Sequence, residues 1–204
     1  MADRWAGRRE PGPGQGQLYW HVLFKNYPQV QHLAFIAQQR LARFPGLHFT
    51  PRQWLHMTTL IAGFAEEFTE DEVGDMVERA RQLLAGIPPI TVTLGRILYH
   101  PEAIVFALRP GAALDPVFKA VRAATHLAAT GEETARSQAW TPHVTVAYST
   151  SVQPAGPIIA ALGRELPSCQ VTISRIDLVV QEGSERLWNW RSIAEVPFGG
   201  LSSP

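Results

Sequence analysis

Two spacings of apolar residues run through the first half of the chain, one typical of strands and one typical of helices. Short runs rich in branched and aromatic residues predict strands at residues 18–24, 47–50, 54–61 and 90–98. Apolar side chains three and four positions apart predict helices at residues 28–44 and 69–86. The second of these helices is opened by a capping box of Thr69 and Glu72.

The second half repeats this order of elements. Strands are predicted at residues 103–109 and 140–148, helices at 114–129 and 155–166, and a closing pair of strands at 170–181 and 187–196. Strands and helices alternate in both halves, which predicts an α+β protein with an internal duplication and pseudo-twofold symmetry. Residues 130–139 are compatible with either a solvated loop or a flap over the strand that follows them.

The triplet His-x-Thr occurs three times in the chain. His56-Met57-Thr58 and His143-Val144-Thr145 each lie in an apolar run predicted as a strand, where residues i and i+2 share one face. The third copy, His48-Phe49-Thr50, is followed at once by Pro51 and has no such run around it. We therefore interpret His48 as a residue of a strand edge or loop and keep the other two copies as one candidate site.

Pseudo-twofold symmetry would place the polar faces of these two strands opposite each other. Two histidines on opposite sides of a phosphodiester can act as base and acid, because an imidazole titrates near neutral pH. Two threonine hydroxyls can hold the non-bridging phosphate oxygens. The pattern predicts His56 and His143 as catalytic residues and Thr58 and Thr145 as phosphate-binding residues, with no metal ion required.

Composition narrows the setting of this chemistry. The 204 residues carry no formal net charge, which disfavours a broad nucleic-acid-binding surface. Cys169 is the only cysteine, so an internal disulfide and a cysteine-based zinc site are excluded, and a reducing cytoplasmic setting fits. No apolar run is long enough for a membrane span. We expect a cytoplasmic monomer with no obligate protein partner, a flexible tail over residues 1–16 and a single domain over residues 17–204.

The two motifs, in apolar strands at this separation, resemble the 2H phosphoesterase superfamily. The order of elements resembles its branch of 2′-5′ RNA ligases and RNA 2′,3′-cyclic phosphodiesterases. This resemblance implies a bilobal α+β fold in which two mainly antiparallel sheets line a central cleft and helices lie outside. It implies opening of 2′,3′-cyclic phosphates to 2′-phosphates without a metal or other cofactor, with reversible 2′-5′ joining of RNA ends in some members.

The resemblance also implies a substrate that is an RNA 3′ end or a small nucleotide with a cyclic phosphate. It favours His143 as base and His56 as acid for hydrolysis. Tyr148 matches an aromatic that some branches place beside the phosphate, although its odd offset from His143 predicts the other face of the strand. Further candidates for substrate contacts in the cleft are aromatic and basic residues, two of them on one face of the first predicted strand: His21 and Tyr19, together with Trp54, Trp140, Arg109 and Arg136.

Other functions are open to different degrees. A ligase with a covalent lysine needs a Lys-x-x-Gly motif, and neither Lys25 nor Lys119 begins one. A nucleotide-binding module of the same fold without catalysis is a rival, but it would not need two proton-transfer groups. A second rival is a phosphodiesterase of a non-RNA cyclic nucleotide or an oligoadenylate signal, which the neutral net charge favours.

Overall fold

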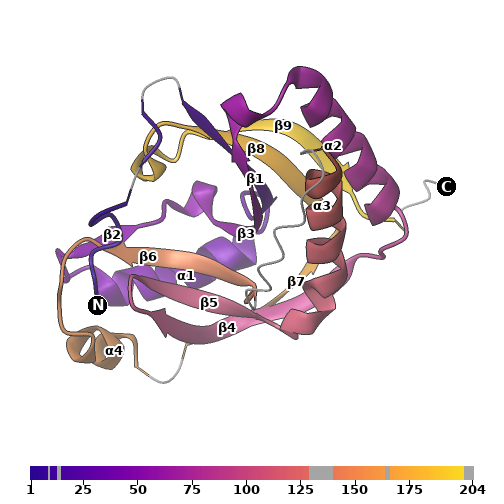
Figure 1. Ribbon diagram of the computed structural model, residues 1–204. Coiled ribbons are helices and arrows are strands. Elements are labelled where there is room, and N and C mark those ends of the chain that lie inside the picture. The colour runs from indigo at the N-terminus through magenta and orange to yellow at the C-terminus, as the bar shows by residue number, and fades with distance from the viewer. Residues whose placement is uncertain (9, 13–14, 129–139, 164–165, 200–204) are drawn as a thin grey trace.

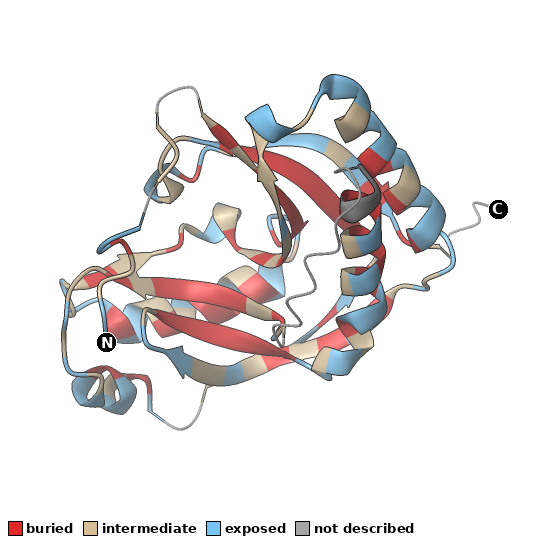
Figure 2. Cartoon of the chain, viewed as in Figure 1, coloured by how far each residue is buried: buried red, intermediate tan, exposed pale blue. Residues whose placement is uncertain are grey.

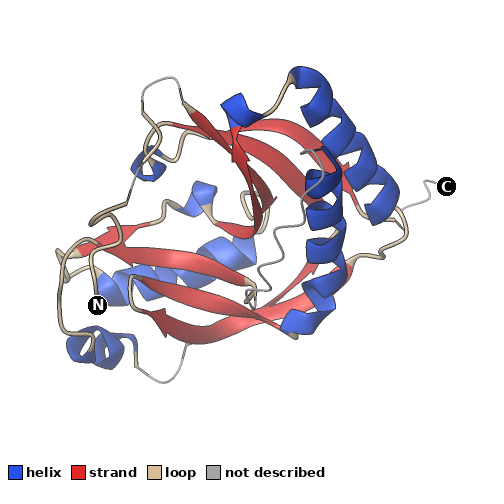
Figure 3. Ribbon diagram, in the orientation of Figure 1, coloured by secondary structure: helices blue, strands red, loops and turns tan. Residues whose placement is uncertain are grey.

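Two antiparallel sheets form the inner layers of the molecule, and helices cover their outer faces (Figure 1; Figure 3). This is a computed structural model, and it describes residues 1–8, 10–12, 15–128, 140–163 and 166–199. Because the fold has two mainly antiparallel sheets with helices outside, the predicted α+β class is confirmed. Arg136 and the predicted loop or flap at residues 130–139 lie outside the described residues.

Each sheet carries one of the two motifs, and we name the sheets by their histidines. The His56 sheet has the strand order β3-β1-β8-β9, formed by β3 (His56–Phe64), β1 (Gly16–Leu23), β8 (Arg175–Glu182) and β9 (Arg191–Pro197). The His143 sheet has the order β2-β6-β5-β4-β7, formed by β2 (Leu47–Phe49), β6 (His143–Ser149), β5 (Ala103–Arg109), β4 (Ile90–His100) and β7 (Cys169–Ile173).

The helices divide between the two sheets. Helices α2 (Glu70–Leu84) and α3 (Asp115–Ala128) pack on each other and contact β9 and β3 of the His56 sheet. Helices α1 (Pro28–Leu41) and α4 (Gly156–Leu162) also pack together, and α1 contacts β6 and β7 of the His143 sheet. Short 3-10 turns complete the described elements: η1 (Arg52–Trp54), η2 (Ala65–Glu67), η3 (Gly111–Leu114) and η4 (Glu185–Leu187).

The start of α2 shows how local sequence fixes an element. Thr69 Oγ1 accepts a hydrogen bond from the Glu72 backbone N–H at 3.3 Å, and the Glu72 carboxylate accepts one from the Thr69 N–H at 2.7 Å. The predicted capping box is therefore confirmed. It satisfies two backbone donors that the first turn of a helix otherwise leaves without partners.

The predicted strand 170–181 is wrong as one element, because it is two strands in different sheets. Residues 169–173 form β7 of the His143 sheet, whereas residues 175–182 form β8 of the His56 sheet. The apolar alternation changes phase at the crossing: Val171 and Ile173 are buried, and the next buried pair two residues apart is Ile176 and Leu178. An odd step of three residues is incompatible with one continuous strand face.

The two lobes are also not the two halves of the sequence. The first and last parts of the chain together form the His56 sheet, and the middle part forms most of the His143 sheet (Figure 1). The motif strands β3 and β6 lie next to each other where the sheets meet. The main buried apolar cluster runs from α2 and α3 through both sheets to α1, and Figure 2 shows the buried residues of the inner strands in red. The lobes are therefore joined by a shared core.

A bulge follows the threonine in each motif strand. In β3 the pairing with β1 skips Thr59, since Thr58 lies opposite His21 and Leu60 lies opposite Trp20. In β6 the pairing with β5 skips Val146 between Thr145 and Ala147 in the same way. Each bulge adds one residue, so side chains beyond it change face relative to the motif.

The N-terminal residues are packed on the protein, in contrast to the flexible tail predicted from their polar composition. The Ala2 N–H donates to Pro101 O at 2.7 Å, and the Arg4 N–H donates to Ser149 O at 2.9 Å. Trp5 is 8% exposed and lies edge-on to the rings of His48 and Tyr148. A buried tryptophan anchors this segment because it removes a large apolar surface from water.

Among the described residues, no helix is both long and apolar enough to cross a membrane.

Candidate active site

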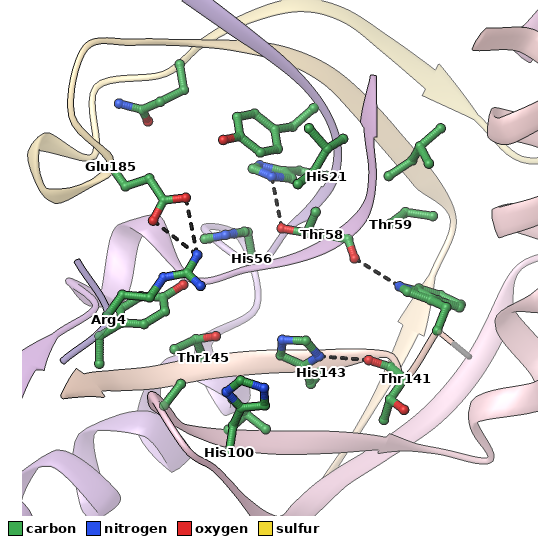
Figure 4. A pocket seen from close by; sticks show the side chains of 18 of the residues that line it. Arg4, His21, His56, Thr58, Thr59, His100, Thr141, His143, Thr145 and Glu185 are labelled. Carbon is green, nitrogen blue, oxygen red and sulfur yellow. Dashed lines mark hydrogen bonds and ion pairs between the residues drawn. The ribbon is translucent and has the colours of Figure 1, made fainter. Parts of the chain in front are cut away.

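A cavity of about 820 Å³ lies between the two sheets and contains all four predicted motif side chains. Figure 4 shows His56 and Thr58 on the wall formed by β3 and His143 and Thr145 on the facing wall formed by β6. The alternation of an extended strand turns Met57 and Val144 away from the cavity, and both are fully buried. The volume of the cavity lies within the range that is usual for small-molecule sites.

Both histidines are held in the same way by the backbone. His56 Nδ1 lies 2.8 Å from the carbonyl oxygen of Trp54, and His143 Nδ1 lies 2.7 Å from that of Thr141. A carbonyl oxygen can only accept, so Nδ1 carries the proton in both rings. Nε2 of each neutral ring therefore has a free lone pair for a proton. The sequence cannot show this, because it depends on the bend of the chain two residues before each motif.

Burial keeps both imidazoles neutral near pH 7. It lowers the pKa of His56 to about 4, despite the opposing bond to Trp54 O, and a positive charge on His143 also acts to lower it. Burial also lowers the pKa of His143, with smaller contributions from His100 and Arg4. Each ring is thus a proton acceptor near neutral pH. The effect of His143 on His56 also shows that the two walls interact electrostatically.

The two threonines have different partners. Thr58 Oγ1 is 3.2 Å from Nε2 of His21 on β1. Thr145 is hydrogen-bonded to the Tyr148 hydroxyl, which opposes the rise that burial causes in the pKa of Tyr148. The position opposite Thr145 on β5 is Val105, which has no polar group. The pseudo-twofold arrangement of the motifs is therefore not matched by their surroundings.

Tyr148 lines the cavity, contrary to the face that its odd offset predicts. The bulge at Val146 is the reason, since it shifts the alternation of β6 by one residue between Thr145 and Tyr148. The bulge at Thr59 does the same on β3, so Ile61 lines the cavity at the position equivalent to Tyr148.

The other predicted substrate contacts divide into two groups. Tyr19 and His21 line the cavity, while Trp20 and Val22 between and beyond them point into the core. Trp140 also lines it; its Nε1–H donates to Thr58 O at 3.2 Å and its ring stacks on Phe118 with centroids 5.1 Å apart.

Trp54 and Arg109 do not line the cavity. Trp54 instead supplies its backbone carbonyl to His56 and packs edge-on against Trp190. Arg109 is exposed at the end of β5, two residues past the position that pairs with His143. The prediction that Trp54 and Arg109 contact the substrate is therefore not supported by their positions.

A charged group at one end of the cavity was not predicted from the sequence. Arg4 donates to Glu102 Oε2 at 3.2 Å and to both carboxylate oxygens of Glu185 at 3.2 and 3.3 Å, as Figure 4 shows in part. Its guanidinium lies 5.2 Å from the centroid of the Tyr148 ring, and Arg8 lines the same end of the cavity. A tryptophan next to Arg4 in an otherwise polar segment is the one sequence signal for this packing.

Two further tryptophans, Trp188 and Trp190, line the cavity from the loop between β8 and β9. Trp188 stacks on Tyr148 and on His48, and its Nε1–H donates to His48 Nε2 at 3.3 Å. His48 thus belongs to the edge strand β2, in agreement with its interpretation from sequence, and does not line the cavity. The loop reaches from the His56 sheet to the His143 sheet and closes this end of the cavity.

The sequence profile of the 2′-5′ RNA ligase superfamily matches residues 28–185, which include both motifs and most of the chain. The chain belongs to the 2′-5′ RNA ligase superfamily. The resemblance to 2H phosphoesterases is thereby confirmed. The match begins after β1, so Arg4, Tyr19 and His21 lie before the matched part of the superfamily profile.

Solved structures support the superfamily's fold for this chain. TT0787 of Thermus thermophilus is similar with a TM-score of 0.69 and 18% identity, covering 91% of this chain and 99% of its own. LigT of E. coli, complexed with ATP, has a TM-score of 0.64 and 13% identity over 91% and 99%. The PDE domain of MHV ns2 has a TM-score of 0.57 and 10% identity over 82% and 99%. No curated protein matches the chain in sequence.

Proposed function

We propose that this member of the superfamily is a phosphodiesterase that opens terminal 2′,3′-cyclic phosphates of RNA or nucleotides to 2′-phosphates, without a metal ion. One observation carries the proposal: His56 and His143 face one cavity from opposite walls, and both have Nδ1 fixed on a backbone carbonyl. Both Nε2 atoms are therefore available for proton transfer to a phosphodiester between the walls.

The reaction needs one proton acceptor and one proton donor. A neutral imidazole takes a proton from water as its oxygen attacks phosphorus, and the opposite imidazolium gives a proton to the leaving O3′, which leaves the phosphate on O2′. Thr58 and Thr145 donate to the non-bridging oxygens, whose negative charge grows in the transition state. We assign the base to His143 and the acid to His56, as the resemblance favours.

The acid role of His56 requires a change in its protonation. Its pKa of about 4 means that the ring is neutral near pH 7. A bound phosphate places a negative charge beside the ring, which favours the imidazolium and raises the pKa. Substrate binding therefore favours the protonated form of His56, which the acid role requires.

The size and charge of the cavity support a small or terminal substrate. About 820 Å³ is enough for a nucleotide, and Arg4 is already paired with two carboxylates, so it adds little free positive charge for a long RNA. LigT, which has the same fold, was crystallised with ATP and with 3′-AMP. A phosphodiesterase of a non-RNA cyclic nucleotide or of an oligoadenylate signal is the alternative that this neutral cavity favours. The cytoplasmic, monomeric state expected from the sequence remains part of the proposal.

The proposal is tested with a panel of nucleoside 2′,3′-cyclic phosphates, cyclic-phosphate-ended RNAs and 2′-5′ linked oligonucleotides in excess chelator. We expect a 2′-phosphate product by phosphorus NMR, and a loss of at least about 100-fold in rate for His56→Ala and for His143→Ala. His32→Ala, at an exposed position of α1, is the matched control and should retain the rate. Full activity in both cavity variants, or binding of nucleotides without turnover, would exclude the mechanism.

A substrate with an activated leaving group assigns the two roles. A nitrophenyl phosphodiester needs no protonation of its leaving oxygen, so the variant lacking the acid should recover much of its rate on it. The variant lacking the base should remain impaired. Recovery by His143→Ala instead of His56→Ala would reverse the assignment.

A further inference from the structure

His21 lies beside the proposed catalytic groups but belongs to neither motif. It is 2% exposed, and its ring stacks on the His56 ring with centroids 4.4 Å apart and planes 28° apart. Its Nε2 lies 3.2 Å from Thr58 Oγ1, the contact marked by a dashed line in Figure 4. It therefore touches both members of the first motif.

The direction of the bond between His21 and Thr58 decides what Thr58 can do. The hydroxyl has one proton. If His21 Nε2 accepts that proton, Thr58 has none left for a phosphate oxygen. If His21 Nε2–H donates to the hydroxyl oxygen, the proton of Thr58 is free to point into the cavity.

The surroundings of the other ring nitrogen settle this direction. His21 Nδ1 is buried and has no hydrogen-bond partner among the described residues. A buried N–H without an acceptor is rarer in proteins than an acceptor without a donor. Such an N–H has lost its hydrogen bond to water on burial and has gained none in the protein. Burial and the nearby His56 lower the pKa of His21 well below its ordinary value, so the ring carries one proton. That proton belongs on Nε2, where it has a partner.

The second motif provides an internal comparison. The position of β5 opposite Thr145 is Val105, whereas the position of β1 opposite Thr58 is His21. Thr145 is bonded instead to the Tyr148 hydroxyl, which can turn to accept or donate. Of the two threonines, only Thr58 is held by a ring whose donor position is fixed by burial.

We propose that His21 is a positioning residue: it donates Nε2–H to Thr58, directs the Thr58 hydroxyl proton toward the non-bridging oxygen of the bound phosphate, and holds the His56 ring by stacking. This inference rests on the proposed function for its effect on rate. The tautomer that it requires does not depend on that function.

The tautomer is tested without substrate by multiple-bond 1H–15N NMR of the nitrogen-15-labelled protein near pH 7.5. We expect His21 to be protonated at Nε2, and His56 and His143 to be protonated at Nδ1 because of their carbonyl partners. Assignment of the three signals comes from single substitutions. A proton on Nδ1 of His21 would overturn the proposal, whatever reaction the protein catalyses.

The effect on rate is tested by a double-mutant cycle. Thr58→Val should lower kcat by about 100-fold, as removal of one donor to a developing oxyanion does, with little change in KM. His21→Phe keeps the stacking ring but loses the donor and should lower kcat by about 10-fold or more. Both substitutions act through the same interaction, the bond from the Thr58 hydroxyl to the phosphate oxygen. The double variant should therefore be no slower than Thr58→Val alone.

Two controls separate positioning from damage to the fold. His21→Gln places an N–H close to the Nε2 position and should regain most of the kcat that His21→Phe loses. His32→Phe makes the same substitution on the exposed face of α1 and should retain wild-type kcat. Multiplicative losses in the double variant, or full activity of His21→Phe, would refute the positioning role. An inactive wild-type protein would refute the proposed function and leave the tautomer measurement valid.

Discussion

At the scale of single residues, the imidazoles of His21, His56 and His143 lie close together, and the pKa values of His21 and His56 are strongly lowered. Burial is the largest cause of the lowered pKa in His21 and in His56, and each histidine disfavours a charge on a neighbour. A charge on either ring of the stacked pair is therefore unfavourable unless a bound anion compensates it. This has a consequence for the stability of the whole protein in acid.

The free energy of unfolding should fall as the pH is lowered from about 6.5 to about 4. An unfolded histidine binds a proton near pH 6.5, whereas His56 in the folded protein does so near pH 4 and His21 well below its ordinary value. Between these limits the unfolded chain binds more protons, so acid favours unfolding. Each such histidine contributes a slope of up to about 1.4 kcal/mol per pH unit.

Urea unfolding midpoints measured at several pH values between 7.5 and 4.5 test this prediction. His21→Phe removes one of the two groups, so its unfolding free energy should depend less on pH than that of the wild type. Equal slopes in the two proteins would show that His21 is not held neutral by the fold.

At the scale of elements, the sequence predicted the strands and helices well but not where the chain leaves one regular pattern for another. The His-x-Thr spacing was sufficient to place two side chains on one face of each motif strand, because two-residue periodicity is local. The bulges at Thr59 and Val146 depend on pairing with β1 and β5, so the face of Tyr148 could not be predicted from β6 alone. The phase change after Ile173 was visible in the sequence, but only pairing shows that it marks a change of sheet.

The N-terminal segment and the β8–β9 loop form a second element-scale feature. Arg4 is ion-paired with Glu185, and the Arg186 guanidinium lies 4.1 Å from the centroid of the Trp5 ring. The N-terminal backbone is bonded to the His143 sheet, whereas Glu185 and Arg186 follow β8 of the His56 sheet. These contacts connect the two lobes at one end of the cavity.

Deletion of residues 2–8 should therefore destabilise the protein and loosen this loop. Loss of one buried aromatic costs about 2 kcal/mol, which lowers the Tm of a chain of this size by about 4–8 °C. Hydrogen exchange followed by mass spectrometry should show faster exchange in residues 183–190 and unchanged exchange in α1, which lies on the outer face of the other sheet. Unchanged exchange in the loop would contradict a bridging role for the N-terminal segment.

At the scale of the whole molecule, the cavity lies between two lobes that share one apolar core. The His56 sheet pairs β1 and β3 with β8 and β9 from the other end of the chain. One apolar cluster spans both sheets, so neither lobe has a core of its own. The geometry of the two catalytic walls therefore depends on the folding of the entire chain.

The two lobes should unfold in one cooperative transition. Amide signals of Ile176 in β8 and Ile104 in β5, followed by NMR in urea, should give the same midpoint, because a shared core links their stabilities. Ile176→Ala, at a fully buried position, should lower both midpoints together by an amount that corresponds to about 2–5 kcal/mol. Two separate midpoints, or a loss confined to the His56 sheet, would show independent lobes.

The crossing from β7 to β8 also sets an order of events while the protein is being made. A ribosome releases the chain from its N-terminus, so β1 and β3 emerge early, but the neighbours β8 and β9 emerge last. The five strands of the His143 sheet all precede β8 in the chain, so they can pair among themselves sooner. Strands of the His143 wall can thus begin to pair early in translation, whereas β1 of the His56 wall keeps one edge unpaired until β8 emerges, and the shared core forms only after that.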